Sequence, residues 1–331
     1  MSTDPNSFDS AVVLAADLGG THLRVALVDE SGKILSQLKK ETPIGTDPEC
    51  VVRALVDAEQ QCRAASNVAD GRVIAASIMV PGAVDKTNAI VVQAPNLPCL
   101  NNFALRQALE LRFGLPVVLE NDANAAAVGE MWLGAARGYR NVVCVTLGTG
   151  VGGGIILDGK LWRGSDGSAG EFGHTTVNPF GGLKCKCGNE GCLELFASAT
   201  AIVRMAMEDL PHFPQSLLKD EKLTAKKVYD AGSQGDELAI AVFERVGKYL
   251  GVGLVNIINL LNPEIIVIGG GVVAGWNLFE NAMRQQVADR VFRSQVNRVK
   301  IVPAECGDNA GLLGAARLAF AGRVAEIETT Y

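Results

Sequence analysis

The pattern of apolar and polar residues predicts an α/β protein in which one strand arrangement occurs twice. Apolar stretches at residues 11–16, 23–29 and 34–39 are separated by short glycine turns, as expected of consecutive strands. A similar order returns from residue 142, where TLGTGVGGGIILDGKLW parallels the earlier DLGGTHLRVALVDESGKIL. Other buried strands are predicted at 73–80, 117–119 and 265–268. The chain therefore shows a weak internal duplication, with two lobes built on the same hairpin.

Apolar residues at helical spacing separate these strands. The spacing predicts helices at residues 49–66, 103–113, 123–136, 195–207, 236–261 and 309–321. A polar break at residues 121–124 lies between a strand and a helix. We therefore expect a polar tail over residues 1–10, a small lobe over 11–121 that the C-terminal helix (309–331) joins, and a large lobe over 122–308. Two lobes that each present a Gly/Thr turn suggest a phosphate ligand in a cleft between them.

Composition and charge limit the classes of protein to which the chain can belong. The chain has 331 residues, 48% of them hydrophobic, and 37 glycines, as expected of a compact protein with more than one core. The formal charge of −6 and the absence of a basic cluster argue against a nucleic-acid surface. The longest apolar run, residues 250–261, is too short to cross a bilayer. A polar, acidic N-terminus and isolated cysteines predict a cytoplasmic protein without a signal peptide.

Three of the eight cysteines lie within eight residues of a glycine-rich segment, close to one of the three histidines. The four residues are His174, Cys185, Cys187 and Cys192. Thiolates and an imidazole in such a set suit tetrahedral zinc, and glycines allow ligands so close in sequence to converge. The alternative is a group of buried thiols, but a glycine-rich segment is poor core composition. Because the protein ligands are complete, the site should be structural.

Three glycine turns, at residues 19–21, 148–153 and 269–271, follow predicted strands, and the second leads into a further strand predicted at 154–157. None has the G-K-[ST] of a Walker sequence, and none is a G-x-G-x-x-G that opens a helix. Backbone N–H groups in tight glycine turns can still bind anions, although a single turn is more typical of an ordinary hairpin. Three such turns in one chain favour phosphate binding. Asp17, before the first turn, is placed to approach a magnesium-bound phosphate.

These segments together resemble the successive motifs of the ROK family (repressors, open reading frames, kinases). The motifs are DLGGTHLR at 17–24, LENDANA at 119–125, LGTGVGGG at 147–154, EFGH at 171–174 and C-x-C-G-x-x-G-C-x-E at 185–194. The match extends from about residue 11 to 320. It implies the α/β, actin-like ATPase fold of sugar kinases, with two lobes and an interlobe cleft for ATP. It also implies Mg²⁺ with ATP and structural Zn²⁺ at the cysteine cluster.

The resemblance also implies roles for single residues. Asp122 would be the catalytic base that accepts the proton of a sugar hydroxyl, although an Asp at this place could also cap the following helix. The sugar would be bound by Gly82, Asn96, Asn121, Asp122, Glu171, His174 and Glu194. ATP would be bound by Asp17, Gly19, Gly20, Thr21, Arg24, Gly148, Thr149, Gly150, Gly152, Gly153, Gly270 and Gly271. One nitrogen of His174 would bind zinc while the other faces the sugar.

Two departures from the family pattern affect the sugar pocket and the first turn. Cys99-Leu100 follows residues 95–98 where Gly-Trp is common, and His22 stands where Lys is frequent. The implied reaction is ATP-dependent phosphorylation of glucose to glucose 6-phosphate. Alternatives are an N-acetylmannosamine or N-acetylglucosamine kinase, a kinase of fructose or allose, a sugar-binding module without turnover, and a sugar-responsive transcriptional repressor. The expected partners are ATP and a hexose, in a homodimer or homotetramer, without nucleic acid or membrane.

Overall fold

A computed structural model describes residues 10–328 apart from 44, 67, 69–71, 86–89, 95 and 220–221, with the backbone alone for 323–328. The chain divides into two compact units. Unit 1 combines the chain up to Gly138 with Leu161–Ala169 and the chain from Asp308 onward. Unit 2 consists of Tyr139–Lys160 and Gly170–Gly307. Nearly all of the predicted tail, and residue 95 of the predicted sugar segment, lie outside the described residues.

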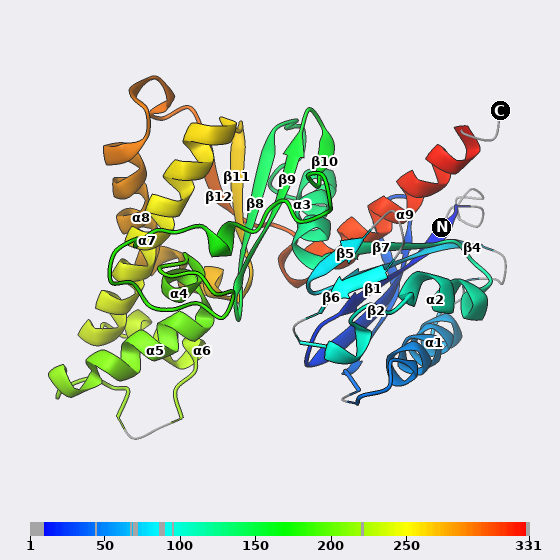
Figure 1. Ribbon diagram of the computed structural model, residues 1–331, viewed down its shortest axis with the longest axis horizontal. Coiled ribbons are helices and arrows are strands. Elements are labelled where there is room, and N and C mark those ends of the chain that lie inside the picture. The colour runs from blue at the N-terminus through cyan, green and yellow to red at the C-terminus, as the bar shows by residue number, and fades with distance from the viewer. Residues whose placement is uncertain are drawn as a thin grey trace, which may run out of the picture. The chain divides into compact units, whose positions relative to one another are not determined.

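Unit 1 is built on a five-stranded sheet in the order β3-β2-β1-β4-β7 (Figure 1). The strands are β1 (Val12–Leu18), β2 (His22–Asp29), β3 (Ile34–Glu41), β4 (Val73–Val80) and β7 (Val117–Asn121). β1 pairs antiparallel with β2 and parallel with β4, and β4 pairs parallel with β7. All five strands were predicted from the sequence. A small hairpin of β5 (Ala83–Asp85) and β6 (Ile90–Gln93) was not.

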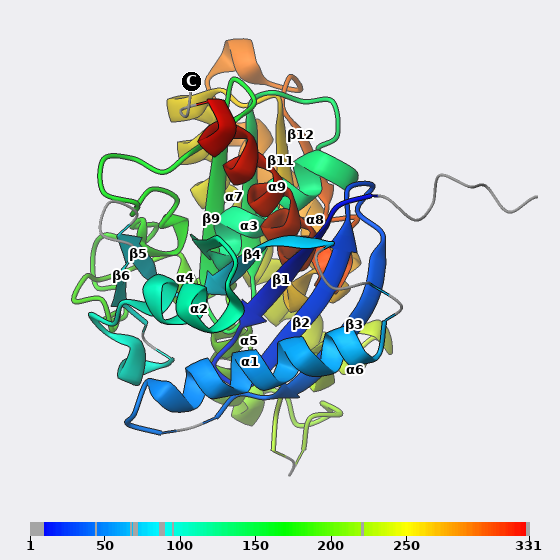
Figure 2. The ribbon, with the colours of Figure 1, turned by 90° about the vertical axis from the view of Figure 1, so that its right-hand side faces the viewer.

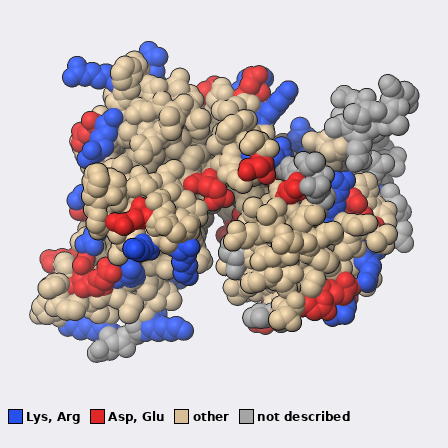
Figure 3. Space-filling view, viewed as in Figure 1, with Lys and Arg blue, Asp and Glu red and all other residues tan. Residues whose placement is uncertain are grey.

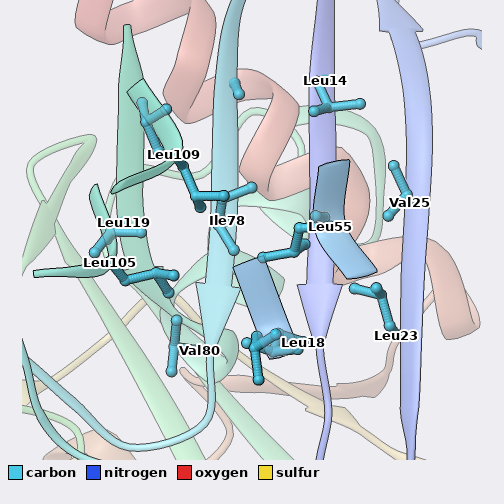
Figure 4. Close-up of a cluster of buried hydrophobic side chains, with 14 of the residues drawn as sticks. Leu14, Leu18, Leu23, Val25, Leu55, Ile78, Val80, Leu105, Leu109 and Leu119 are labelled. Atoms are coloured by element: carbon cyan, nitrogen blue, oxygen red, sulfur yellow. The ribbon is translucent and has the colours of Figure 1, made fainter. Parts of the chain in front are cut away.

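Alternate residues of β1 face opposite sides of this sheet, as the pleat requires. Leu14 and Leu18 join a core with side chains of α1 (Glu49–Ala64) and α2 (Leu105–Phe113). Figure 4 shows part of this core, including Leu55. The other face packs against α9 (Ala310–Glu328), which lies across the sheet from α1 in Figure 2.

Helix α3 (Asp122–Leu133) belongs to unit 1, whereas the sequence suggested a boundary just before it. The reason is its close packing on α9. A Cβ added at Gly129 would lie 2.0 Å from the carbonyl oxygen of Ala310, and one at Gly314 would lie 1.7 Å from that of Ala125. Only glycine permits backbones to approach so closely. The two helices therefore pack as a pair although about 180 residues separate them.

A second five-stranded sheet, ordered β10-β9-β8-β11-β12, has β8, β9, β11 and β12 in unit 2, whereas the residues of β10 after Lys160 belong to unit 1. Its strands are β8 (Val142–Leu147), β9 (Val151–Leu157), β10 (Lys160–Trp162), β11 (Ile265–Gly269) and β12 (Lys300–Pro303). β8 pairs antiparallel with β9 and parallel with β11, and β11 pairs parallel with β12. Strand for strand, this repeats the order and direction of the pairings of β1, β2, β4 and β7. The predicted internal duplication is confirmed.

The helices of unit 2 are α4 (Glu194–Ala197), α5 (Ala199–Asp209), α6 (Ala225–Ser233), α7 (Glu237–Leu261) and α8 (Trp276–Arg290). Helices α7 and α8 pack side by side (Figure 1). The sequence predicted neither α6 nor α8. Short 3₁₀ turns, labelled η, lie at η1 (Pro98–Leu100), η2 (Phe172–His174), η3 (Leu210–His212), η4 (Gly271–Gly275), η5 (Arg293–Gln295) and η6 (Gly307–Asn309).

The helices and one face of the surface bear on the membrane-protein and nucleic-acid-binding classes. Among the described residues, no helix has the length and apolarity needed to cross a membrane. On the face drawn in Figure 3, basic and acidic side chains are interspersed among other residues.

Candidate functional site

The first predicted phosphate turn lies between β1 and β2 in unit 1. Gly19 donates its N–H to the carbonyl of His22 at 2.9 Å, and the hydroxyl of Thr42 donates to the carbonyl of Gly19 at 2.6 Å. Asp17 and Arg24 face each other across the hairpin, and Arg24 Nε donates to Asp17 Oδ2 at 2.9 Å. Two residues predicted to meet ATP are thus brought together as an ion pair beside the turn. Thr21 is part of the same turn.

The predicted sugar residues of unit 1 lie at the same edge of its sheet. β1, β4 and β7 run parallel, so their carboxyl ends meet at one edge. Gly20 of the first turn packs against Asn96, because a Cβ at position 20 would lie 2.7 Å from the Asn96 Cβ. Asn121 Nδ2 donates to the carbonyl of Gly82 at 3.1 Å. The turn and the predicted sugar residues of this unit therefore form one group.

The geometry at the start of α3 distinguishes the two roles considered for Asp122, catalytic base and helix cap. The helix cap is Asn121, whose Oδ1 accepts from the N–H groups of Ala123 at 2.9 Å and Asn124 at 3.1 Å. Asp122 is the first helical residue and is exposed, and its Oδ1 accepts from the N–H of Ala123 at 2.9 Å. Capping, the alternative role for Asp122, is thus performed by its neighbour. An acidic side chain in the first turn also suits the helix dipole.

The second predicted phosphate turn, Gly148 to Gly150 in unit 2, is fixed by contacts from a distant segment. Ala199 N–H donates to the carbonyl of Gly148 at 2.8 Å, and the hydroxyl of Thr200 donates to that of Thr149 at 2.8 Å. Glu194, at the start of α4, accepts from the N–H of Val151 at 3.0 Å through Oε2. The predicted sugar ligand Glu194 therefore also supports the glycine turn, a contact that the sequence did not indicate.

The turn is shorter than the sequence suggested. Strand β9 begins at Val151, not at Gly154, so Gly152 and Gly153 lie within the strand and pair with Thr146 and Val145. A Cβ at Gly153 would lie 2.2 Å from the ring of Phe172, so close ring packing explains this glycine. Backbone pairing with β8 thus removes two predicted ATP residues from the turn itself.

The third glycine segment follows β11, which runs parallel to β8. Gly270 has φ of 86°, and a Cβ there would lie 2.4 Å from the carbonyl of Leu147, the last residue of β8. Gly271 starts η4. The second and third glycine segments therefore lie together at the carboxyl edge of the sheet in unit 2.

A pocket of about 650 Å³ lies beside the second turn, within unit 2. Its walls are partly apolar, with Val203 and Met207 from α5 and Leu223 before α6. The remaining lining residues are Thr149, Ala199, Thr200, Arg204, Glu208, Thr224 and Ala225. Sequence reasoning missed this pocket because it did not predict α6. A hollow that combines apolar walls with a few polar groups is typical of a small-molecule site.

The cysteine cluster has the arrangement predicted for a metal site. One ligand atom from each of His174, Cys185, Cys187 and Cys192 lies within 4.8 Å of the other three. The sulfurs of Cys187 and Cys192 are 3.7 Å apart, and Cys185 Sγ is 3.7 Å from His174 Nδ1. Zinc–sulfur bonds of about 2.3 Å in a tetrahedron would place sulfurs about 3.8 Å apart. The four residues are thus compatible with structural zinc.

The thiols of this cluster differ in their surroundings. Burial raises the pKa of Cys192 to about 12, so a thiolate there needs a nearby cation. Cys187 is exposed, and a hydrogen bond from the backbone of Asn189 lowers its pKa. The Asn189 side chain also donates to Cys192 Sγ at 3.4 Å and to the Thr176 hydroxyl at 3.0 Å. Such outer contacts orient the ligands of a metal.

His174 connects the cysteine cluster to the predicted sugar residues. Its Nδ1 faces Cys185, while its Nε2 lies 3.8 Å from Glu171 Oε2. A Cβ at Gly173, between these two residues, would lie 2.2 Å from the carbonyl of Val151, whose N–H binds Glu194. The segment that carries Glu171 and His174 and the side chain of Glu194 therefore both contact the first residue of β9.

Comparisons with known proteins agree with these motifs. A sequence model of the ROK family matches residues 13–321. A glucokinase of Thermotoga maritima is 39% identical over 312 residues, which cover 92% of this chain and 96% of that protein. A xylose repressor of Caldicellulosiruptor bescii is 33% identical over 314 residues, which cover 92% of this chain and 77% of the repressor.

A solved structure supports the same relationship. The crystal structure of a ROK family glucokinase from Streptomyces griseus, in complex with glucose and AMPPNP, matches with a TM-score of 0.81 at 36% identity. The match covers 94% of this chain and 100% of that chain. The likeness confirms the predicted actin-like ATPase fold of sugar kinases.

Proposed function

The chain belongs to the ROK family, and from that membership we propose that it is a hexose kinase that transfers the γ-phosphoryl group of ATP to glucose. The observation that carries the proposal is the exposed Asp122 at the start of α3, whose capping role is taken by Asn121. Its neighbour Asn121, a second predicted sugar residue, also contacts Gly82. The high coverage of glucokinase relatives supports glucose as the acceptor.

In the proposed reaction Asp122 accepts the proton of the attacking sugar hydroxyl. Asn121 and Asn96, on the same edge of the sheet, would hydrogen-bond neighbouring hydroxyls, and Gly82, whose carbonyl accepts from Asn121, would lie beside the ring. Glu171, His174 and Glu194 would accept or donate hydrogen bonds from unit 2. Each sugar hydroxyl needs such a partner once it leaves water.

The glycine turns and the pocket would bind ATP. We assign the phosphates to the turns at Gly19–Thr21, Gly148–Gly150 and Gly270–Gly271, where backbone N–H groups and Thr hydroxyls can donate. We assign the adenine to the partly apolar pocket beside Thr149. Magnesium bound with ATP would supply positive charge against the phosphate oxygens. Asp17 would face that ion, and its existing contact with Arg24 holds the carboxylate in place.

The cysteine cluster would hold one structural zinc ion through His174, Cys185, Cys187 and Cys192. Zinc there would fix the loop that leads from Glu171 to Glu194. Since one nitrogen of His174 faces the cluster and the other faces Glu171, binding would also fix the imidazole tautomer. Assembly into a homodimer or homotetramer is a further prediction, which the mass of the protein in solution tests.

A coupled assay across hexoses and N-acetylhexosamines tests the acceptor. We expect glucose to exceed mannose and both to exceed fructose, because an unpaired buried partner costs about 1–3 kcal/mol. N-acetylmannosamine or N-acetylglucosamine used tenfold better than glucose would replace glucose as the substrate. Absence of turnover with every sugar, in a protein that binds sugar and an operator DNA, would favour the repressor instead.

The variant Asp122→Asn tests the base. We expect kcat to fall by about 10²–10⁴, with glucose affinity little changed, because a general base contributes in that range. Asp158→Asn, an exposed carboxylate of unit 2 paired with Arg140, is the matched control and should keep full activity. Unchanged kcat in purified Asp122→Asn protein would refute the role.

A further inference from the structure

We propose that Arg163 is a positioning residue that holds Asp122 in place through the buried carboxylate of Glu120. The inference rests on the proposed function, because it concerns the residue assigned as the base. Arg163 lies in the segment Leu161–Ala169, which belongs to unit 1 although the chain on either side of it belongs to unit 2. The observations that support it all lie within unit 1.

Glu120 is a charged residue in an enclosed position, with only 2% of its surface exposed. Its Oε2 accepts from Arg163 Nε at 2.9 Å and from Arg163 Nη2 at 2.8 Å. Its Oε1 accepts from the backbone N–H of Asn121 at 3.1 Å and from Asn124 Nδ2 at 3.1 Å. A buried carboxylate requires such compensation. Glu120 therefore links the guanidinium of Arg163 to the first turn of α3.

The contacts of Glu120 lie on both sides of Asp122. Asn121 precedes it and caps the helix, while Asn124 follows two residues later on the same turn. A shift of the Glu120 carboxylate would thus move the backbone before Asp122 and the helical turn after it. A misplacement of about 1 Å at a reacting group can cost about 10²-fold in rate. The position of the proposed base hence depends on the pair formed by Glu120 and Arg163.

Arg163 is itself fixed by its segment. The N–H of Ala169 donates to the carbonyl of Arg163 at 3.1 Å, which folds the segment back on itself. Gly167, with φ of 95°, approaches β5 so closely that a Cβ would lie 2.8 Å from the carbonyl of Val84. A guanidinium offers its donors in a rigid fork, whereas a lysine ammonium can approach as a point charge. The fork therefore holds Glu120 in one orientation.

The experiment compares Arg163→Met, Arg163→Lys, Glu120→Gln and the double variant Arg163→Met with Glu120→Gln. We expect Arg163→Met to lower kcat about 10²-fold per folded molecule, with KM for ATP changed by less than about twofold. Arg163→Lys should recover part of the loss. The double variant should exceed Arg163→Met by about tenfold, because a neutral amide at position 120 needs no cation. Arg140→Met, an exposed arginine of unit 2, is the control.

Hydrogen exchange gives a second readout that does not depend on turnover. In Arg163→Met, exchange of the N–H groups of Ala123 and Asn124 should accelerate, while exchange in α7 should stay as in the wild type. If the wild type phosphorylates no sugar, the proposed function fails, and exchange still decides the role of Arg163. Unchanged exchange at Ala123 and Asn124, or losses of kcat that only follow the folded fraction, would overturn the proposal.

Discussion

The two hairpins β1–β2 and β8–β9 have the same place in their sheets but differ in what surrounds their turns. In unit 1 the second residue pair from the turn is Asp17 and Arg24, whereas the corresponding pair in unit 2 is Thr146 and Gly152. The first turn is thus flanked by charges. The second has no charge at these positions, but the 650 Å³ pocket lies beside it.

This difference shows how a repeated backbone can serve unlike purposes. In each hairpin a strand ends in a glycine turn whose N–H groups can meet an anion. The side chains around each hairpin determine which other groups can bind there. We propose that unit 1 supplies the carboxylates for metal-bound phosphate and for proton transfer, and that unit 2 supplies room for the adenine and the zinc-bound loop.

Among variants that compare the two turns, the largest expected effect comes from removing the charge of Asp17. Asp17→Asn should lower kcat about 10²-fold, because a fixed charge aimed at a transferring phosphate contributes on that scale. Thr146→Val, at the corresponding position of unit 2, should change kcat by less than about twofold. Steady-state kinetics with glucose and ATP measure both. Equal losses in the two variants would remove the distinction between the turns.

The next effect concerns the loop that supports the second turn. Cys187→Ser, at the exposed thiol of the cluster, should lose zinc and lower kcat/KM for glucose about 10–100-fold. Glu194 would lose its anchorage, so the turn at Gly150 should also loosen. Metal analysis and kinetics provide the measurement, and Cys50→Ser is the control. Metal-free wild type with full activity would show that the cluster does not support the site.

The next, smaller effects distinguish a glycine of the second turn that is needed for packing from one that is needed for phosphate binding. A Cβ at position 150 would lie 2.3 Å from Glu194 Oε2, whereas one at position 148 meets nothing within 4 Å. Gly150→Ala should therefore lower the free energy of unfolding by about 1–3 kcal/mol. Gly148→Ala should keep its stability and raise KM for ATP. Denaturant unfolding and kinetics distinguish them, and an unchanged KM in Gly148→Ala would move the phosphates away from this residue.

The smallest expected effect is on the stability of a helix that lies away from the turns. Asp236 caps α7, accepting from the N–H groups of Ala239 at 2.9 Å and Leu217 at 2.6 Å. Burial acts to raise its pKa, but these hydrogen bonds outweigh it and hold the pKa below the usual value. Asp236→Asn should cost about 1 kcal/mol at neutral pH with kcat unchanged.

The sign of this pH dependence follows from the depressed pKa. The contribution of the carboxylate is fully present above the unfolded pKa of about 3.9 and is lost as the pH falls through the lower folded value. The difference in unfolding free energy between wild type and Asp236→Asn should therefore be constant above about pH 5 and shrink in acid. A difference independent of pH would show that hydrogen bonding to a neutral side chain suffices.

Long periodic segments were predictable from the sequence, and elements with weak patterns were not. The strands of the first sheet and helix α7 follow clear apolar spacing. Helix α8 buries only Phe279 and Met283 of the large side chains in its 15 residues, so its apolar stripe is too thin to recognise. Strand β12 has four residues and ends in Pro303. Short elements, and elements that bury few large apolar side chains, were therefore not predictable from the apolar spacing.

The residues of the candidate site also divide into those that the sequence predicted and those that it did not. The clustering of His174 with the three cysteines was predicted because all four residues lie within 19 residues and share a chemistry. The support of the second turn by Glu194 depends on a contact across 43 residues, and the pairing of Glu120 with Arg163 also spans 43. A single sequence gives no signal for such contacts, because no spacing or residue type marks them.

The placement of α9 has a consequence for how the chain is made. This helix completes one face of the first sheet, yet it begins at Ala310 while β1 begins at Val12. At synthesis rates of roughly 5–20 residues per second, the sheet, whose last strand ends at Asn121, precedes this helix by about 10–40 s. During that interval its apolar face is uncovered in the nascent chain, so chaperone binding and aggregation compete with folding until translation ends.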